Sequence, residues 1–269
     1  MKIIKIPYTP RPQQRMLHEK LSKYRFSVIV MHRRAGKTVW AINHLIKLAL
    51  TSGKKNFRGA FFSPTRVQSK LIGWDYLKEF SRVIPGMKYN ETELRADFPN
   101  GARITLFGAE NPDASRGQFF DQVVCDEYAQ MDARMFAEII RPAIADRLGS
   151  CTFIGTPAGM GNNFYDLIEE AKSLSDWYTC VFKASETGLV APEELESARK
   201  LMTEDQYAQE FECSWTANIS GSIYGKIIQK MEEDNQISNF PYDPGYPVDC
   251  YFDLGISDKT VILFTQQIG

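Results

Sequence analysis

The tripeptide Gly36-Lys37-Thr38 has the residue types and spacing of a phosphate-binding loop, which would bring two side chains to a nucleoside triphosphate. In such loops the lysine bridges the β- and γ-phosphates, and the threonine hydroxyl binds Mg²⁺. The pattern G-x-x-x-x-G-K-[ST] is met at every position except the first, where Met31 replaces glycine. The residues predict a nucleotide and Mg²⁺ as ligands, while an ordinary Gly-Lys-Thr turn before a helix stays open.

The segments on either side of this tripeptide predict the elements that a phosphate loop needs. Residues 26–31 form an apolar run typical of a buried strand, and a helix with apolar residues is expected to begin near Lys37. Between them, the backbone N–H groups of Arg34, Ala35 and Gly36 would face the β-phosphate at the N-terminus of this helix. A strand, a basic turn and a helix would therefore hold the ligand.

Asp126 and Glu127 end another apolar run, residues 120–126. An aspartate at the end of a strand can bind Mg²⁺ beside Thr38, and the adjacent carboxylate can polarise the attacking water. A further run ends in Thr156-Pro, where Thr156 could sense the γ-phosphate and relay its loss. An ordinary strand-to-loop turn is the alternative at both places.

Arg116 lies in a Ser-Arg-Gly loop shortly before the strand of Asp126. An arginine directed at the γ-phosphate stabilises the charge that develops during phosphoryl transfer. Arg33 and Arg34, inside the phosphate loop, compete for this function. Spacing does not tell whether Arg116 serves its own site or that of a neighbouring chain, and each arginine could instead be a surface or DNA-facing charge.

Tyr8 and Gln14 lie upstream of the phosphate loop, on a proline-punctuated segment and at the start of a predicted helix. An aromatic ring can stack on adenine, and a glutamine amide can read adenine N6 and N7 as a donor–acceptor pair. We therefore expect ATP as the nucleotide, with Gln14, ahead of Gln13, on the base and Tyr8 as a stacking ring. A solvated helix start is the alternative.

Charge is divided unevenly along the 269 residues, although the formal net charge is −1. Residues 1–90 hold nineteen Lys/Arg and three Asp/Glu, a balance of +16, and the remainder carries −17. A basic first third indicates a surface for a polyanion, unless the two parts pair with each other in the fold. Five scattered cysteines and three separate histidines predict neither a disulfide framework nor a zinc site. Without a long apolar run or a signal-peptide core, we expect neither a membrane-spanning nor a secreted protein.

Strands and helices are predicted to alternate through most of the chain, which is typical of a doubly wound α/β fold with a mainly parallel sheet. The expected strands are the mostly apolar runs at 26–31, 58–64, 120–126, 150–155 and 177–182. An Asn-Gly pair at 100–101 predicts an additional β-hairpin. Ligands of such sheets bind beyond the carboxyl ends of the strands, where the phosphate loop would lie.

Four parts are expected along the chain. Residues 1–190 would form a phosphate-loop ATPase core. Residues 191–231, with helical patterns and Thr203 at an N-cap, would form a small helical lid. Residues 232–248 are acidic and rich in Pro and Gly, as in a linker. Residues 249–269 would supply the first strands of a second domain that is not completed.

Taken together, these residues resemble the large terminase subunit of tailed bacteriophages. Phosphate loops that contain an arginine and lack the first glycine are common in that family, so Met31 is no obstacle. The resemblance covers nearly the whole chain and implies a P-loop NTPase fold of the ASCE type. It rests on Gln14, the loop Arg-Arg-Ala-Gly-Lys-Thr (33–38), Ser-Pro-Thr (63–65), Ser-Arg-Gly (115–117), Val-Cys-Asp-Glu (124–127) and Gly-Thr-Pro (155–157).

The resemblance also implies roles for the matched residues. Lys37 and Thr38 would hold phosphate and Mg²⁺, and Asp126 the metal. Glu127 would be the catalytic carboxylate. Thr156 would couple hydrolysis to movement. Arg116 becomes a candidate arginine finger that acts across a subunit interface.

Partners follow from the same resemblance. Family members work in the host cytoplasm with a small terminase subunit, as rings typically of five, docked on the portal protein of an empty procapsid. There they translocate double-stranded DNA. Their second domain is an RNase H-like nuclease that holds two metals, and Asp253 resembles its first catalytic aspartate. A two-metal site needs ligands from several strands, so we expect no DNA cleavage by this chain, whether it is a truncated piece or carries a vestigial tail.

Two other functions remain open on the sequence. A superfamily-two helicase or translocase shares the upstream glutamine, the phosphate loop and the Asp-Glu pair, but it needs a complete second motor domain. A non-hydrolysing, ATP-dependent assembly module would also bind nucleotide. The presence of Glu127 argues against the assembly module, because a site that only binds needs no water-activating carboxylate.

Overall fold

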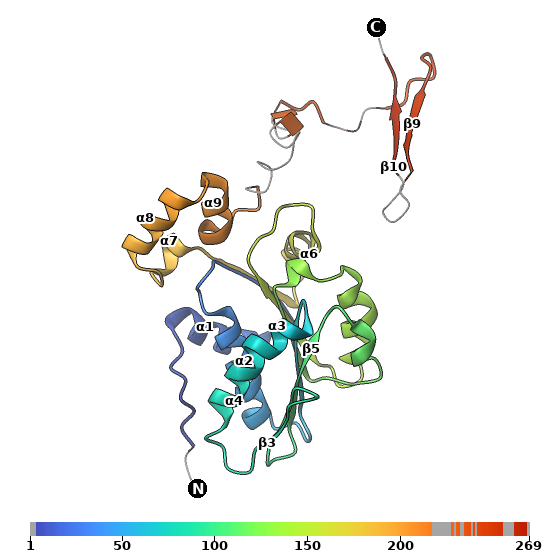
Figure 1. Cartoon of the computed structure of the whole chain (residues 1–269). Helices are drawn as coiled ribbons and strands as arrows, with labels where there is room; N and C mark the ends of the chain where they lie inside the picture. The colour runs from blue at the N-terminus through green and yellow to red at the C-terminus, as the bar shows by residue number, and fades with distance from the viewer. Residues whose placement is uncertain are drawn as a thin grey trace. The chain divides into compact units, whose positions relative to one another are not determined.

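Eight strands form one sheet in the computed structural model of the protein, which describes residues 4–216, 227–228, 230–231, 234–237, 239, 241–254 and 261–267 (Figure 1). The strand order is β3-β4-β5-β2-β6-β7-β1-β8. The six strands from β5 to β8 in this order run parallel, whereas β4 pairs antiparallel with β3 and β5. This is the mainly parallel α/β sheet predicted from the sequence.

The strands follow the predicted apolar runs closely. They are β1 (Phe26–Met31), β2 (Arg58–Ser63), β3 (Lys88–Asn90), β4 (Arg95–Asp97), β5 (Arg103–Gly108), β6 (Gln122–Asp126), β7 (Ser150–Gly155) and β8 (Trp177–Phe182). The predicted hairpin is formed by β4 and β5, and Gly101 in its turn has a φ of 84° that favours glycine.

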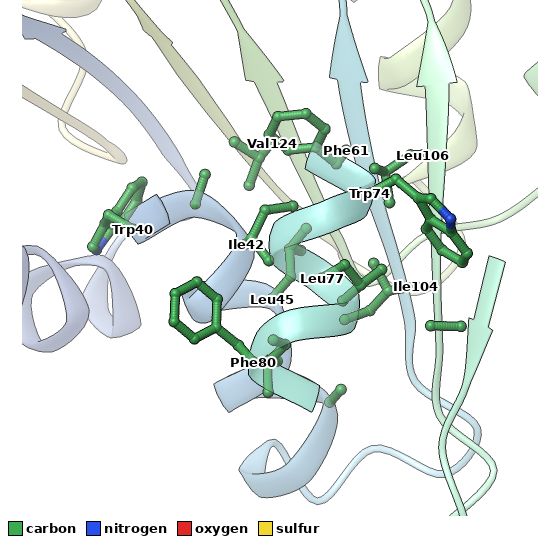
Figure 2. Packing of buried hydrophobic residues seen from close by; sticks show 14 of the residues in the cluster. Trp40, Ile42, Leu45, Phe61, Trp74, Leu77, Phe80, Ile104, Leu106 and Val124 are labelled. Carbon is green, nitrogen blue, oxygen red and sulfur yellow. The ribbon is translucent and has the colours of Figure 1, made fainter. Parts of the chain in front are cut away.

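Helices cover the sheet on both faces because alternate strand residues point to opposite sides. The first face carries α1 (Pro12–Lys20), η1 (Leu21–Lys23), α2 (Lys37–Thr51), η2 (Ser69–Trp74) and α4 (Asp75–Ser81), with the short α3 (Arg66–Gln68) leading into η2. Figure 2 shows Ile42 and Leu45 of α2 packed with Leu77 of α4 against the sheet.

The second face is covered by a different set of elements. They are η4 (Tyr128–Gln130), η5 (Met135–Ile140), α5 (Arg141–Ala143) and α6 (Asn163–Ala171). The short turn η3 (Pro112–Ser115) lies in the loop between β5 and β6. Both hydrophobic layers therefore fix the carboxyl ends of the central strands from two sides.

A small helical group, called the lid below, follows β8 and includes the helices predicted after residue 191. It comprises α7 (Ala184–Thr187), α8 (Pro192–Leu201) and α9 (Glu204–Glu212), with a core of Ala184, Tyr207 and Phe211. Thr203 caps α9, since its side chain accepts a hydrogen bond from the Gln206 backbone N–H. Residues 217–226 and part of the predicted linker 232–248 lie outside the described residues.

The chain divides into two compact units, residues 1–222 and 223–269. The described part of the second unit contains an antiparallel pair, β9 (Asp249–Asp253) and β10 (Val261–Thr265). No helix among the described residues is long and apolar enough to span a membrane. Within the same residues, no cluster of His, Cys, Asp and Glu could hold a metal ion on its own.

Candidate nucleotide-binding site

The loop between β1 and α2 curls back on itself at Gly36. This residue caps α2 with a φ of 83°, and Arg34 before it also lies in the left-handed region, with a φ of 68°. A Cβ at position 36 would come within 2.9 Å of Gln14 Nε2, which donates a hydrogen bond to the Gly36 carbonyl over 3.1 Å. Only glycine satisfies both the backbone angle and this close approach.

Met31 occupies the place of the missing first glycine without distorting the loop. It is the last residue of β1, and its side chain is fully buried in the first hydrophobic layer. Its carbonyl oxygen faces the loop and accepts hydrogen bonds from Lys37 Nζ at 3.5 Å and Thr156 Oγ1 at 3.3 Å. Position 31 therefore contributes its backbone, and a large side chain is compatible with the site.

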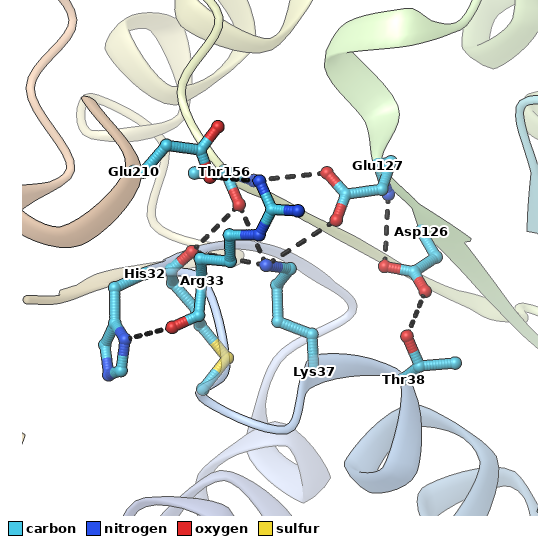
Figure 3. Close-up of polar contacts among 9 residues, drawn as sticks. His32, Arg33, Lys37, Thr38, Asp126, Glu127, Thr156 and Glu210 are labelled. Atoms are coloured by element: carbon cyan, nitrogen blue, oxygen red, sulfur yellow. Dashed lines mark hydrogen bonds and ion pairs between the residues drawn. The ribbon is translucent and has the colours of Figure 1, made fainter. Parts of the chain in front are cut away.

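Lys37 lies at the centre of the site, with a side chain that is only 9% exposed (Figure 3). Its Nζ donates to Thr156 Oγ1 at 2.8 Å and lies 3.5 Å from Glu127 Oε1. These contacts, with that to the Met31 carbonyl, come from the ends of three strands, β1, β7 and β6. The ammonium group is thus held where these strands end.

Thr38 and Asp126, 88 positions apart in sequence, are in direct contact. The Thr38 hydroxyl donates to Asp126 Oδ2 over 2.6 Å, and Asp126 Oδ1 accepts the Glu127 N–H at 3.1 Å. Burial of Asp126 and then the adjacent charge of Glu127 raise its pKa to about 6. The Thr38 hydroxyl and the buried Asp126 carboxylate are oxygen donors of the kind that Mg²⁺ prefers, so these two residues fit the expected ion.

Glu127 reaches toward the lysine from an unusual backbone conformation. Its φ is 53°, in the left-handed region, which costs free energy for a residue other than glycine. The side chain is 35% exposed, and its Oε2 accepts the Thr156 N–H at 3.5 Å. The turn after β6 therefore aims this carboxylate into open space beside Lys37.

That open space is a cavity of about 340 Å³ between the strand ends and the lid. It is lined by the phosphate loop, the turn after β6, the turn after β7 and helix α9, through Arg33, Lys37, Glu127, Ala129, Gln130, Thr156, Pro157, Ala158, Gln209 and Glu210. Basic, acidic and hydroxyl groups share this cavity. It can accommodate phosphates next to a carboxylate that orients water.

The lid contacts the phosphate loop directly, which the sequence did not indicate. The Arg33 N–H donates to the Glu210 carbonyl over 2.7 Å, and its guanidinium lies 3.4 Å from the Glu210 carboxylate. His32 Nε2 lies 2.8 Å from the Thr187 hydroxyl. Burial lowers the pKa of His32, which favours the neutral ring in this contact. No local signal marks Glu210 or His32 as site residues, because each contacts a distant part of the chain. Arg33 and Glu210 lie 177 positions apart in sequence, and His32 and Thr187 lie 155 positions apart.

Tyr8 and Gln14, assigned to adenine from the sequence, lie in the scaffold behind the loop. Gln14 is 3% exposed, and its Oε1 accepts from the Tyr8 hydroxyl at 3.2 Å and from the Arg11 N–H at 3.0 Å. The Tyr8 ring packs edge-to-face against His18 and Phe80. Here these two residues support Gly36, and their contact with a base stays a prediction.

Arg116 is not among the residues that line the cavity, and Asp253 belongs to the second unit. Arg116 follows η3, is 60% exposed, and forms an ion pair with Asp113. Asp253 ends β9 in the second unit. Whether either residue takes part in chemistry remains a prediction.

The sheet, the Gly36 turn and the Lys37–Thr38–Asp126 arrangement define a P-loop NTPase. Residues 28–231 match the family described as terminase large subunit, T4likevirus-type, N-terminal. The chain therefore belongs to the terminase large subunit family.

Individual relatives agree with this membership. The large terminase subunit of Thermus virus P23-45 is 25% identical over 179 residues, which cover 59% of this chain and 36% of that protein; the one from Thermus phage G20c matches to the same extent. The chain thus spans about a third of the length of these curated relatives.

Solved structures show the same fold. The ATPase domain of the Thermus phage P74-26 large terminase superposes with a TM-score of 0.67 at 19% identity, covering 78% of this chain and 95% of that domain. The large terminase of another thermophilic bacteriophage, in complex with ADP, gives a TM-score of 0.65 at 14% identity, covering 97% of this chain and 65% of the other.

Proposed function

We propose that the chain is the ATP-hydrolysing part of a motor subunit that translocates double-stranded viral DNA into a procapsid. The observation that carries this proposal is the 2.6 Å contact between the Thr38 hydroxyl and Asp126, in a corner shared with Lys37 and Glu127. It brings together the phosphate-binding, metal-binding and water-orienting groups that ATP hydrolysis needs. Membership of the terminase family supports a packaging motor over a helicase.

The geometry supports a division of tasks within the site. Lys37 would exchange its contacts with Thr156 and Glu127 for the β- and γ-phosphates of ATP, because those contacts use the same ammonium protons. Glu127 is then free to orient a water molecule toward the γ-phosphate. Thr38 and Asp126 would hold Mg²⁺, which when bound neutralises phosphate charge. Nucleotide binding is supported by the ADP complex of the terminase from the thermophilic bacteriophage.

Two arginines are proposed to respond to the γ-phosphate. Arg33 is held by Glu210 of the lid and lines the cavity, so phosphate could compete with Glu210 for it. Arg116 is exposed and does not line the cavity of Lys37, which favours a role in the nucleotide site of a neighbouring subunit. Thr156 contacts both Lys37 and Glu127, and would relay loss of the γ-phosphate to β7.

Partners and location are proposed from the family. They are double-stranded DNA, the portal protein, a small terminase subunit and a ring of subunits, typically five, in the host cytoplasm and transiently on the procapsid. We also propose the four-part organisation, with core 1–190, lid 191–231, linker 232–248 and nuclease-like strands 249–269. Asp253 would be one ligand of a nuclease-like metal site.

The test is steady-state ATP hydrolysis as a function of protein concentration, with Glu127→Ala, Arg116→Ala and the surface control Lys23→Ala. We expect turnover to rise faster than linearly for wild type and control, and to be lost in the other two variants. Tight Mg·ATP binding by wild type without hydrolysis, even on DNA or portal, would refute the motor and favour an assembly module.

A further inference from the structure

A second cavity, of about 550 Å³, lies on the sheet face opposite α2 and α4, toward the β3 edge. Four arginines line it: Arg58 of β2, Arg95 of β4, Arg103 of β5 and Arg66 of α3. Arg103 pairs in register with Arg58 on the neighbouring strand. We call this cavity the arginine groove.

The groove exists because helices cover only part of this face. Elements η5, α5 and α6 belong to the hydrophobic layer that includes β6, β7 and β1, whereas the loop between β5 and β6 borders the groove. Asp97 compensates part of the charge, lying 2.6 Å from Arg103 and 3.1 Å from Arg95. Burial and the charges of Arg103 and Arg147 lower the pKa of Arg58. Glu93, which also lines the groove, forms an ion pair with Arg95, so four arginines face two carboxylates and the groove keeps an excess of positive charge.

The lid has the opposite charge. Helices α8 and α9 carry seven carboxylates and two basic side chains, Arg199 and Lys200. Glu193 and Glu194, at the exposed start of α8, form no ion pair with any residue that the structure describes. Each surface also exposes one large apolar side chain, since Leu201 at the end of α8 is 86% exposed and Phe119 in the groove 44%.

The two surfaces lie toward opposite edges of one sheet. The lid follows β8, which is an edge strand, and contacts the loop after β1, which is next to β8. The groove lies on β2, β5 and β4, near the other edge. Both belong to the first compact unit, so the sheet keeps them apart within one chain. Complementary surfaces at opposite ends of a rigid body favour head-to-tail association, which closes into a ring if the rotation allows.

We propose that the acidic lid of one copy of this chain docks in the arginine groove of the next copy. This inference rests on the proposed motor function and specifies how its subunits meet. Ala114, Gly117 and Gln118, which flank Arg116 in sequence, line the groove, while Gln209 and Glu210 of the lid line the nucleotide cavity. Docking thus brings the loop of Arg116 toward the neighbour's cavity.

Charge reversal tests the pairing on the whole chain. A groove variant carries Arg66→Glu and Arg103→Glu, a lid variant carries Glu193→Lys and Glu194→Lys, and a third variant combines all four. Sedimentation equilibrium at low ionic strength measures association. We expect each two-site variant to associate at least about tenfold more weakly than wild type, and the combined variant to recover association to within about threefold. Salt should weaken wild-type association.

Controls separate this pairing from loss of fold and from other occupants. Lys23→Glu reverses an exposed charge elsewhere and should leave association unchanged; thermal unfolding checks each fold, and Arg66→Glu alone replaces the groove variant if Arg103→Glu unfolds. A wild type that stays monomeric at about 200 μM, or a combined variant that fails to recover, overturns the pairing. So does a groove variant that loses only DNA binding, which would assign the groove to DNA phosphates.

ATP hydrolysis measured in the same samples distinguishes the two proposals. Hydrolysis that persists while the reversals leave association unchanged means that only the docking surfaces are wrong. Absent hydrolysis with association that still follows the charges means that the motor function is wrong and the docking stands.

Discussion

Asp126 and Asp253 each end a short apolar strand, but their surroundings differ completely. Asp126 ends β6 in the middle of the large sheet, is 6% exposed and accepts a hydrogen bond from Thr38. Asp253 ends β9 of a two-stranded pair whose described residues are all exposed. The same local sequence pattern therefore gives a crowded polar corner in one unit and an exposed carboxylate in the other.

The difference shows what turns a strand-end carboxylate into a site. The parallel strands β1, β7 and β6 end at the same edge of the sheet. The residues that follow these ends therefore contact one another: Lys37 contacts Thr156, and Thr156 contacts Glu127, the neighbour of Asp126. A metal or phosphate site needs several such ligands at fixed distances. In the pair β9–β10, Asp253 lies opposite Val261, and the other carboxylate, Asp249, is at the far end of the same strand.

The largest effect is expected from changing each aspartate to asparagine. Asp126→Asn should lower ATP turnover about a thousandfold, because the site would lose the carboxylate that we propose holds Mg²⁺ beside Thr38. Asp253→Asn should leave turnover unchanged. A coupled assay of phosphate release on both variants measures this. Equal losses in both would show that the second unit takes part in hydrolysis and that the two aspartates are not separate in function.

Packing should separate the two units almost as strongly. Phe61 on β2 is fully buried, so Phe61→Ala should lower the free energy of unfolding by about 3–5 kcal/mol. Phe264 on β10 is 65% exposed, and Phe264→Ala should change it by less than about 0.5 kcal/mol. Denaturant unfolding followed by circular dichroism measures both. A loss above about 2 kcal/mol for Phe264→Ala would show that this face of the hairpin is covered in solution.

Local patterns predicted the elements of the core well. The apolar runs gave the central strands, the Asn-Gly pair gave the hairpin, and the helix after the phosphate loop begins at Lys37 as expected. These features depend on neighbours in sequence, such as alternation, turn residues and caps. The Thr203 cap of α9 was predicted for the same reason.

Contacts between distant segments could not be predicted in this way. Glu210 meets Arg33 only because the chain returns from β8 through the lid to the phosphate loop. Tyr8 and Gln14 were assigned to adenine from residue type, and the pattern gave no sign that Gln14 hydrogen-bonds to Tyr8 and to the Gly36 carbonyl. Composition showed a basic first third, but only the folded sheet shows that one of its arginines, Arg58, lies beside Arg103 of the next strand.

Acid should destabilise the first unit through His18 and His44, whose Nδ1 atoms lie 3.1 Å apart. Burial lowers the pKa of His18 to about 4 and that of His44 to about 3. The unfolded chain binds protons near pH 6.5 while the native state does not, so stability is full above about pH 6.5 and falls as pH drops toward about 4. At pH 5.5 each histidine lowers the free energy of unfolding by about 1 kcal/mol. The raised pKa of Asp126 acts in the opposite direction below about pH 6 and offsets part of this loss.

Unfolding at pH 7.0 and 5.5 tests this for wild type, His44→Leu and Phe264→Ala. His44→Leu should reduce the pH-dependent loss by about 1 kcal/mol, whereas Phe264→Ala should keep the wild-type loss, since residues 223–269 contain no histidine. All three proteins contain Asp126, so its contribution to the pH dependence cancels when they are compared. An unchanged loss in His44→Leu would contradict a neutral, buried pair.

The smallest effect concerns two helix caps, one in the lid and one in the core. Thr203 caps α9 and Asn162 caps α6, where its side chain accepts from the Phe164 and Tyr165 N–H groups. Changing either cap residue to alanine should lower the stability of its helix by about 1 kcal/mol. The lid has only a three-residue buried core, so Thr203→Ala should speed amide hydrogen exchange about fivefold within α9 alone. Asn162→Ala should instead lower global stability, because α6 packs in the large second layer. If Thr203→Ala also accelerated exchange in β1, the Arg33–Glu210 contact would have to bind lid and core into one cooperative unit, and the lid could not open without unfolding the site.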